Sequence, residues 1–349
     1  MVWRRASAGQ SPLILERTQG LDPQVQCDKM MSVEARVVFM GTPEFALPTL
    51  ERLVESYTVV GVVTQPDRRS GRGRRVAMPP VKELALAEGI PVFQPNCLRN
   101  VEAVEHIRAW APDVAVVAAY GQIIPVSVLE IPQFGFLNVH ASLLPRWRGA
   151  SPIQGALLAG DTTTGVTIMK LDEGLDTGPI LGMRETPIGP EETAGELENR
   201  LATIGVDLLM EVMSAYLAGK LTPQPQPDEG VTITRRIRKQ QARLDWSDSA
   251  ESLHNQIRAF SPAIGAYTFW DGTRVKVLRS EVVYPDAIPE GGTGTVFLWQ
   301  DVPVIVTGQG CLKLVYVQMA GKRPIDGGAF VRGRTDLVGT RVSSQEPGE

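Results

Sequence analysis

The chain has 349 residues, which is long for one compact unit and predicts two domains. Its hydrophobic fraction of 43% and charged fraction of 21% are ordinary for a globular protein, and no run of 18 apolar residues indicates a membrane span. The three cysteines are far apart and never form C-x-x-C, which excludes a disulfide framework and a cysteine zinc site and favours a reducing, cytoplasmic compartment. A net charge of −4 does not by itself indicate nucleic-acid binding.

Residues 1–30 lack hydrophobic periodicity and differ from the sequence that follows. We interpret them as an N-terminal extension, expected to be disordered and outside the fold. The alternative is a targeting peptide, which the pair Arg4-Arg5 favours. The absence of an apolar segment and the three acidic residues of this stretch argue against that alternative.

From residue 31 to residue 221, short apolar strands alternate with helical patterns. Thr42 and Pro43 have the residue types of a helix N-cap and first turn directly after the first strand. Apolar strands joined by helices indicate a sheet covered on both faces. The predicted fold is α/β, a Rossmann-like, mostly parallel sheet, with strands at 35–41, 58–64, 113–119, 135–140 and 165–171 and helices at 80–88, 101–110 and 191–218.

The proline-rich stretch that begins at 221 has no periodicity, and we assign residues 222–240 to a linker. Beyond it, a helix is predicted at 248–260 with Ser247 as its cap, followed by short strands. Asp271-Gly272 is a strong hairpin-turn pair. We therefore expect residues 241–349 to form a small β-barrel domain resembling an oligonucleotide-binding (OB) fold.

Asn138 and His140 stand near the carboxyl end of the predicted strand 135–140. Residues two apart on a strand point to the same face, and open α/β sheets bind ligands beyond the carboxyl ends of their strands. A carboxamide beside an imidazole is suited to stabilising a developing oxyanion, as in acyl transfer. The structural alternative is a core histidine bonded to the backbone, with Asn138 ending the strand.

The segment "DEGLDTG" (172–178) follows the strand 165–171 and holds three carboxylates. In a parallel sheet it would share one edge with His140. One of Asp172, Glu173 or Asp176 would then orient the imidazole and favour its protonated form. The alternative is an acidic turn in solvent.

Two runs of basic residues indicate contact with phosphates. Five arginines fall within residues 68–75, and a second run, "RRIRKQQAR", spans 235–243. Like charges held together favour a polyanion, although a solvated basic loop is the alternative. The glycines of the first run and of "GTPEFA" do not make a G-x-G-x-x-G dinucleotide motif, no G-x-S-x-G elbow is present, and the histidines and cysteines are too scattered to predict a metal site.

Several of these stretches resemble the methionyl-tRNA formyltransferases, a branch of the folate-dependent formyltransferases. The matching pieces are "FMGTPEFALPTLERL", "VVTQPDRRSGRGRR", "VVAAYGQIIP", "NVHASLLPRWRGASPIQGALLAGDTTTGVTIMKLDEGLDTG" and "ARLDWSDSAESLHNQIRAFSP". The N-x-H-x-S-L-L-P and D-x-G-x-D-T-G motifs belong to the wider family, whereas the arginine run and "LDW" narrow the resemblance to the tRNA enzymes. Residues 1–30 have no counterpart in this pattern.

The resemblance implies transfer of a formyl group from N10-formyltetrahydrofolate to the α-amine of methionine on initiator methionyl-tRNA. It assigns catalysis to Asn138, His140 and Asp176, and cofactor binding to Ser142, Leu143, Leu144 and Pro145, with Tyr120 and Gly121 alongside. It assigns tRNA binding to the arginine run, with Arg72 as the most telling position, and we add the basic residues after the linker. The complete set of expected tRNA-binding residues is Arg68, Arg69, Arg72, Arg74, Arg75, Arg235, Arg236 and Lys239. No metal is expected, and we expect a monomer that has no membrane contact.

Two other functions remain open at this point. A formyltransferase acting on an amino-sugar nucleotide would use the same three catalytic residues but would not need five arginines in one loop. A non-enzymatic RNA-binding protein with a barrel domain would not need to keep all three catalytic residues.

Overall fold

The computed structural model describes residues 35–70 and 75–345; residues 1–34, 71–74 and 346–349, and with them the N-terminal extension, lie outside the described residues. The chain forms two compact units. The first holds the described residues up to 148 together with 165–186 and 199–233, and the second holds 149–164, 187–198 and the described residues from 234 onward. Residues 222–233, which composition places in a linker, are thus part of the first unit.

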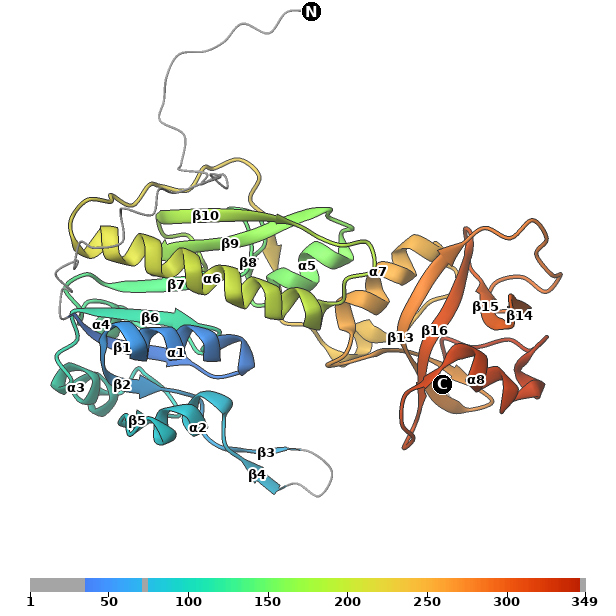
Figure 1. The fold of residues 1–349 in the computed structure, drawn as a ribbon, viewed down its shortest axis with the longest axis horizontal. Helices are drawn as coiled ribbons and strands as arrows, with labels where there is room; N and C mark the ends of the chain where they lie inside the picture. The colour runs from blue at the N-terminus through green and yellow to red at the C-terminus, as the bar shows by residue number, and fades with distance from the viewer. Residues whose placement is uncertain (1–34, 71–74, 346–349) are drawn as a thin grey trace, which may run out of the picture. The chain divides into compact units, whose positions relative to one another are not determined.

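The first unit is built on a seven-stranded sheet in the order β10-β9-β7-β6-β1-β2-β5 (Figure 1). The pairs β1–β2, β1–β6, β2–β5 and β6–β7 are parallel, and β7–β9 is antiparallel. The Rossmann-like, mostly parallel sheet is therefore confirmed. Its strands are β1 (Arg36–Gly41), β2 (Thr58–Val63), β5 (Val92–Phe93), β6 (Val114–Ala118), β7 (Phe136–His140), β9 (Thr163–Lys170) and β10 (Ile180–Pro187).

Helices cover this sheet. The face that carries Val38, Val117 and Phe136 packs against α3 (Val101–Ala109) and α4 (Val126–Leu129). The helix α6 (Ala194–Leu217) approaches Val139 of β7 and Val166 of β9. Because side chains alternate along a strand, Asn138 and His140 share the face of Phe136 and lie opposite Val139. The remaining helices of the first unit are α1 (Leu47–Ser56) and α2 (Pro80–Ala87).

Thr42 has a different role from the predicted helix cap. A 3₁₀ turn, Glu44–Ala46, intervenes before α1, and the side chain of the residue ahead of that turn, Pro43, makes no capping hydrogen bond. The Thr42 hydroxyl instead donates to the carbonyl of Tyr120, 3.0 Å away. This threonine therefore ties the end of β1 to the segment after β6.

The second unit contains an antiparallel sheet in the order β12-β13-β16-β15-β14, with β17 (Ile325–Asp326) beside β16. Its strands are β12 (Ala266–Trp270), β13 (Thr273–Val283), β14 (Val296–Trp299), β15 (Val302–Val306) and β16 (Cys311–Met319). β13 pairs with β16 instead of its successor β14, which is a Greek-key order. Residues 340–343 bond to both edges, through the bridges Phe269↔Ser343 and Thr295↔Arg341, so they join the edge strands into a small barrel.

The predicted hairpin at Asp271-Gly272 is confirmed, because Trp270 pairs with Thr273 and both turn residues have positive φ. The long helix of this unit, α7 (Ala250–Phe260), begins later than predicted. Its cap is Ser249, which accepts a hydrogen bond from the backbone of Ser252, and the prediction of Ser247 is wrong.

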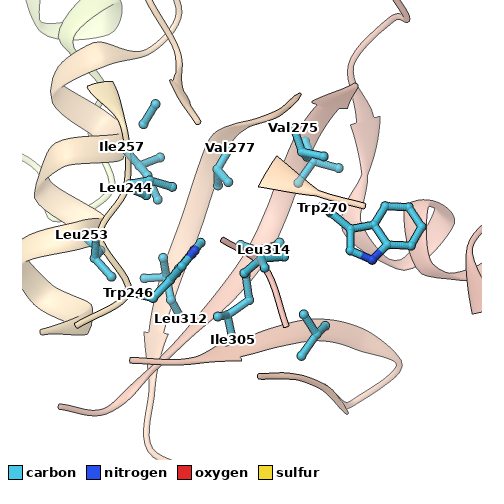
Figure 2. Packing of buried hydrophobic residues seen from close by; sticks show 14 of the residues in the cluster. Leu244, Trp246, Leu253, Ile257, Trp270, Val275, Val277, Ile305, Leu312 and Leu314 are labelled. Atoms are coloured by element: carbon cyan, nitrogen blue, oxygen red, sulfur yellow. The ribbon is translucent and has the colours of Figure 1, made fainter. Parts of the chain in front are cut away.

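The core of the second unit lies between α7 and the barrel (Figure 2). Leu253 and Ile257 of the helix belong to the same buried cluster as Val277 and Leu312 of the sheet. Trp246 joins this cluster and donates its indole N–H to Thr268, 2.9 Å away, so the polar atom of a buried aromatic side chain is satisfied.

Short elements complete the two units. They are β3 (Arg68–Ser70), β4 (Arg75–Ala77), β8 (Arg148–Gly149), α5 (Pro152–Leu158), β11 (Ile233–Thr234), the 3₁₀ turns Lys239–Ala242 and Thr335–Leu337, and α8 (Gly327–Arg332). Within the described part of the chain, no helix has the length and apolar character needed to cross a membrane.

Gly205 sets how closely α6 approaches the sheet. A Cβ atom at this position would lie 2.7 Å from Cγ1 of Val139, which is closer than real side chains pack. We expect Gly205→Val to destabilise the first unit by about 1–3 kcal/mol, the usual cost of overpacking a core. The measurement is a lower transition temperature for that unit in calorimetry. Adding Val139→Ala makes room for the new side chain and is expected to restore part of the loss; a double variant that melts below both single variants would contradict this packing.

Candidate active site

The imidazole of His140 lies at the carboxyl end of β7 and is almost fully buried, with 5% of the residue exposed. Its Nε2 atom is 3.1 Å from the backbone carbonyl of Trp147, and its Nδ1 atom is 3.8 Å from Oδ2 of Asp176. A carbonyl oxygen only accepts hydrogen bonds, so the bond to Trp147 places a hydrogen on Nε2. Nδ1 then faces the carboxylate of Asp176.

Burial lowers the pKa of His140 below its usual 6.5, and this effect is larger than the opposing effects of Asp176 and the Trp147 carbonyl, which raise the pKa. The neutral imidazole is therefore favoured at neutral pH. Asp176, 3.8 Å from the ring, raises this pKa and so acts in the expected direction, but burial has the larger effect.

The other two histidines make contacts that support the fold. His254 bonds to the hydroxyl of Ser280 and to the carbonyl of Pro190, both at 3.0 Å, and His106 stacks on Phe93 with ring centroids 4.1 Å apart. His254 also lies 3.8 Å from a carboxylate, that of Glu191, but on the nitrogen that already faces the Pro190 carbonyl, whereas in His140 the carbonyl and the carboxylate face opposite nitrogens.

Asp176 reaches His140 by a route that the sequence did not predict. β9 runs antiparallel to β7, with Leu137 opposite Lys170, so β9 ends where β7 begins and not beside its carboxyl end. The premise of one shared parallel edge is therefore wrong. The segment 171–179 instead brings Asp176 back to the imidazole, and Asp176 itself has a φ of 51°, a left-handed conformation that costs energy for a residue with a side chain.

The other acidic residues of this segment have different surroundings. Oδ1 of Asp172 accepts hydrogen bonds from the backbone of Gly174 and the hydroxyl of Thr177, so this carboxylate shapes the turn. Glu173 is exposed. Of the three carboxylates considered from the sequence, the structure pairs Asp176 with His140.

Asn138 is half-buried on the same strand, two residues before His140. Strand alternation places its carboxamide on the same face as the imidazole. The two side chains occupy the sheet end at which α/β folds bind their ligands.

The turn after β7 holds the residues expected to bind the cofactor. Ser142 is fully buried and donates from Oγ to the carbonyl of Arg146, 2.7 Å away. Leu144 packs with Met169 and Ile180, and its backbone N–H donates to the hydroxyl of Thr167. Leu143 and Pro145 are half-buried. Ser142 and Leu144 thus hold the turn in place, and Leu143 and Pro145 keep part of their surface exposed.

Tyr120 and Gly121 follow β6. The Tyr120 carbonyl accepts from Thr42 and also from Nε2 of Gln65, at 3.2 Å, and Gly121 has a φ of 81°. The Tyr120 hydroxyl is buried and makes no hydrogen bond to any described residue, and burial raises its pKa. An unsatisfied buried hydroxyl therefore lies at a position expected to bind the cofactor.

The two ends of the first basic run form a pair of short antiparallel strands, β3 and β4. Arg69 of β3 pairs with Val76 of β4, and Arg75 pairs with Ser70; Arg72 and Arg74 lie outside the described residues. Arg68 donates to Oε1 of Gln65, at 2.8 Å, and Gln65 in turn bonds to Tyr120. The strand pair is therefore connected to the segment after β6 through one glutamine side chain.

In the second unit, Arg235, Arg236 and Lys239 are all exposed. Two cations that the sequence analysis did not single out, Arg274 and Lys276 of β13, add to this basic set. Burial, followed by the charges of Arg274 and Lys239, lowers the pKa of Lys276.

No group of three or more histidine, cysteine, aspartate or glutamate side chains suited to a metal ion occurs among the described residues. The chemistry of the site described above is that of an amide, an imidazole and a carboxylate.

Comparison with known proteins assigns the family. A model of the formyl transferase family matches residues 35–213, and a model of the formyl transferase C-terminal domain matches residues 236–335. A curated methionyl-tRNA formyltransferase of Halorhodospira halophila is 48% identical over 310 residues, covering 88% of this chain and 99% of that protein. The chain belongs to the methionyl-tRNA formyltransferase family. A second such enzyme, from Symbiobacterium thermophilum, is 47% identical over 89% of this chain and 96% of its own length.

Solved structures share the formyltransferase fold at low sequence identity. An N-formyltransferase from Helicobacter canadensis, in complex with folinic acid and dTDP-3-aminofucose, matches 81% of this chain and 98% of its own with a TM-score of 0.59 and 18% identity. HypX from Aquifex aeolicus, in complex with tetrahydrofolic acid, matches 85% of this chain and 47% of its own with a TM-score of 0.57 and 15% identity. At these sequence identities, the structural similarity indicates a shared fold only.

Sequence reasoning missed contacts that shape this formyltransferase site. The Trp147 carbonyl is a backbone atom, so the type of residue at this position does not predict its bond to His140, seven residues earlier. The φ of 61° at Trp147 is likewise not evident from a tryptophan in the sequence. The Thr167 hydroxyl donates to the carbonyl of Ser142 and accepts from Leu144, and only the β7–β9 register reveals it.

The His140–Asp176 pair gives a prediction that does not depend on turnover. Asp176 raises the pKa of His140 against the effect of burial, so Asp176→Asn is expected to lower that pKa further. The measurement is an NMR titration of the histidine side chains, in which His106 and His254 serve as internal controls. A rise in the His140 midpoint, or no change, would show that the carboxylate does not act on the imidazole.

Proposed function

We propose that this formyltransferase transfers the formyl group of N10-formyltetrahydrofolate to the α-amine of methionine on initiator methionyl-tRNA. The observation that carries the proposal is the His140–Asp176 pair at the end of β7, with Asn138 on the same strand, in a chain that is 48% identical to a methionyl-tRNA formyltransferase. We place the reaction in the cytoplasm and expect the protein to act as a monomer.

The residues after β6 and β7 fit a folate in specific ways. The buried, unsatisfied hydroxyl of Tyr120 is available to bond a polar ring atom, and the half-buried Leu143 and Pro145 offer apolar surface for a flat ring. Ser142 and Leu144 support this turn through their own hydrogen bonds, so we assign them to shaping the pocket and not to direct side-chain contact.

Each residue of the catalytic group has a proposed role. N10-formyltetrahydrofolate would supply the formyl carbon, and its N10, which carries no hydrogen while formylated, would gain one proton as its bond to the formyl carbon breaks. The Asn138 amide donates to the oxygen on which negative charge develops. The neutral imidazole of His140, favoured by its low pKa, accepts the proton that the attacking amine loses and delivers it to N10. Asp176 stabilises the imidazolium while His140 holds that proton.

Removing the oxyanion donor tests this assignment. We expect Asn138→Ala to lower kcat by about 10²–10³-fold with both substrates saturating, because one lost donor in such a site has a cost of that order. His140→Ala is expected to lower kcat strongly as well, since the proton then has no acceptor. The assay follows labelled formyl-methionine on the tRNA, with a dTDP-3-amino sugar as the alternative acceptor. Near-normal turnover of both variants would contradict the assignment, and preferred formylation of the sugar would contradict the proposed acceptor.

We propose that the first basic run of the sequence binds the tRNA and that the folate binds at the sheet. Its members are Arg68, Arg69, Arg72, Arg74 and Arg75, and we add Arg235, Arg236 and Lys239 of the second unit as phosphate contacts. The charge of these residues supports a polyanionic substrate in a chain whose net charge is −4.

Arg72→Ala is expected to raise the KM for methionyl-tRNA while the KM for N10-formyltetrahydrofolate stays unchanged. Neutralising Arg69, Arg72 and Arg75 together is expected to flatten the dependence of tRNA binding on salt, because each lost phosphate contact reduces the slope by about one unit. Steady-state kinetics and binding at several salt concentrations measure both effects. Full activity of Arg72→Ala at limiting tRNA would overturn this role.

A further inference from the structure

The segment 224–232 has several side-chain and backbone contacts with the turns that surround His140. Composition assigns this segment to a linker, and most of its residues are exposed. Gln226 and Thr232 are half-buried, and both lie in the first unit. They are called the clamp here.

Gln226 holds the backbone of the Asp176 turn. Its Nε2 atom donates to the carbonyls of Asp176 and Gly178, both at 2.8 Å. Its Oε1 atom accepts from Nε and Nη2 of Arg148, at 3.0 and 2.7 Å. The hydrogen-bonding capacity of one amide is used in four contacts, and the charged guanidinium strengthens the set by polarising the amide.

Thr232 holds the other neighbour of the imidazole. Its hydroxyl accepts from the backbone N–H of Trp147 at 2.7 Å, and its own carbonyl accepts from the N–H of Arg148 at 2.9 Å. The carbonyl of the same Trp147 bonds to Nε2 of His140. Thr232 therefore holds both peptide groups of Trp147, through its hydroxyl on the N-terminal side and through its carbonyl on the side whose carbonyl bonds the ring.

The two residues that the clamp holds are in strained conformations. Trp147 and Asp176 have φ values of 61° and 51°, which side-chain-bearing residues adopt only where surrounding contacts enforce them. Gly178 adds a steric constraint, because a Cβ atom there would lie 1.8 Å from the carbonyl of Lys170. The Asp176 turn is thus pressed against β9 on one side and bonded to Gln226 on the other.

We propose that Gln226 and Thr232 are positioning residues for the reaction, holding the Asp176 carboxylate and the Trp147 carbonyl against opposite nitrogens of His140. This inference rests on the proposed function for its kinetic consequence. Its geometric part concerns His140 alone and is measurable without substrates.

Gln226→Met tests the clamp with a neutral side chain of similar length that makes none of the four hydrogen bonds. We expect kcat to fall by about tenfold to hundredfold at saturating substrates, the scale of a small misplacement of a catalytic group, with both KM values unchanged. Gln224→Met is the matched control, because the Gln224 side chain donates to the carbonyl of Thr222, two residues earlier, and reaches no residue near His140 in the described contacts.

The second readout is the NMR titration of His140. The charged group that acts on the ring is the carboxylate of Asp176, and Asp172 belongs to the same turn. On the turn after β7, the guanidinium of Arg146 lies over the Trp147 ring and that of Arg148 bonds to Gln226. A displaced Asp176 no longer raises the pKa of His140, so its midpoint is expected to fall in Gln226→Met and to stay in place in Gln224→Met. A kcat equal to that of the control, or a loss of kcat with an unmoved His140 midpoint, would overturn the proposal.

A second pair of variants covers the case in which Gln226→Met does not fold. Thr232→Val removes the acceptor for Trp147 but keeps the shape, and Thr232→Ser retains the acceptor. We expect the valine variant to lose kcat and the serine variant to keep it; equal turnover of the two would overturn the role of Thr232. If the wild-type protein does not formylate methionyl-tRNA, the proposed function fails, whereas the His140 titrations of the Gln226 and Gln224 variants still decide the positioning role.

Discussion

The site depends on taking one imidazole out of water and placing an acceptor at each of its nitrogens. Burial favours neutral His140, and Asp176 with the Trp147 carbonyl favours its cation, so the proton affinity of the ring is set by opposing effects of local structure. A shift of either neighbour changes that balance. The positions of two short turns therefore matter to the chemistry as much as the identity of the histidine.

The sheet provides the fixed reference for these turns. β7 is an interior strand, pairing with β6 on one side and β9 on the other, and α6 packs so closely on it that a glycine is required at the contact. The strand that carries Asn138 and His140 is thus held on its edges and on the face opposite those side chains. Such support from regular structure restricts the movement of catalytic groups more than a loop alone would.

Much of this arrangement followed from local sequence patterns. Apolar, β-branched strands between helices predicted the parallel sheet, and strand alternation predicted that Asn138 and His140 face one side. The hairpin at Asp271-Gly272 followed from the residue types that positive φ requires. The family assignment came from motifs that the chain shares with known formyltransferases, and the same motifs led to the proposal of Asn138, His140 and Asp176 as catalytic residues.

The errors have a common cause, which is that contacts between distant segments leave little trace in a local pattern. The antiparallel direction of β9 cannot be read from its own residues, and the route of Asp176 to His140 depends on it. The pKa of His140 depends on burial by the whole fold. Gln226 was placed in a linker because prolines surround it, although its amide is bonded on both sides.

The contacts of the segment 224–232 also affect where the chain can be cut to separate the region that matches the formyl transferase model from the region that matches the C-terminal domain model. A fragment cut at residue 221, where the composition changes, would keep the whole seven-stranded sheet but lack Gln226 and Thr232. A fragment that extends through residue 233, where the first unit ends, would retain both. The same choice of boundary arises when domains are exchanged between related enzymes. A junction at the start of the proline-rich stretch would combine His140 of one parent with the residue at position 226 of the other.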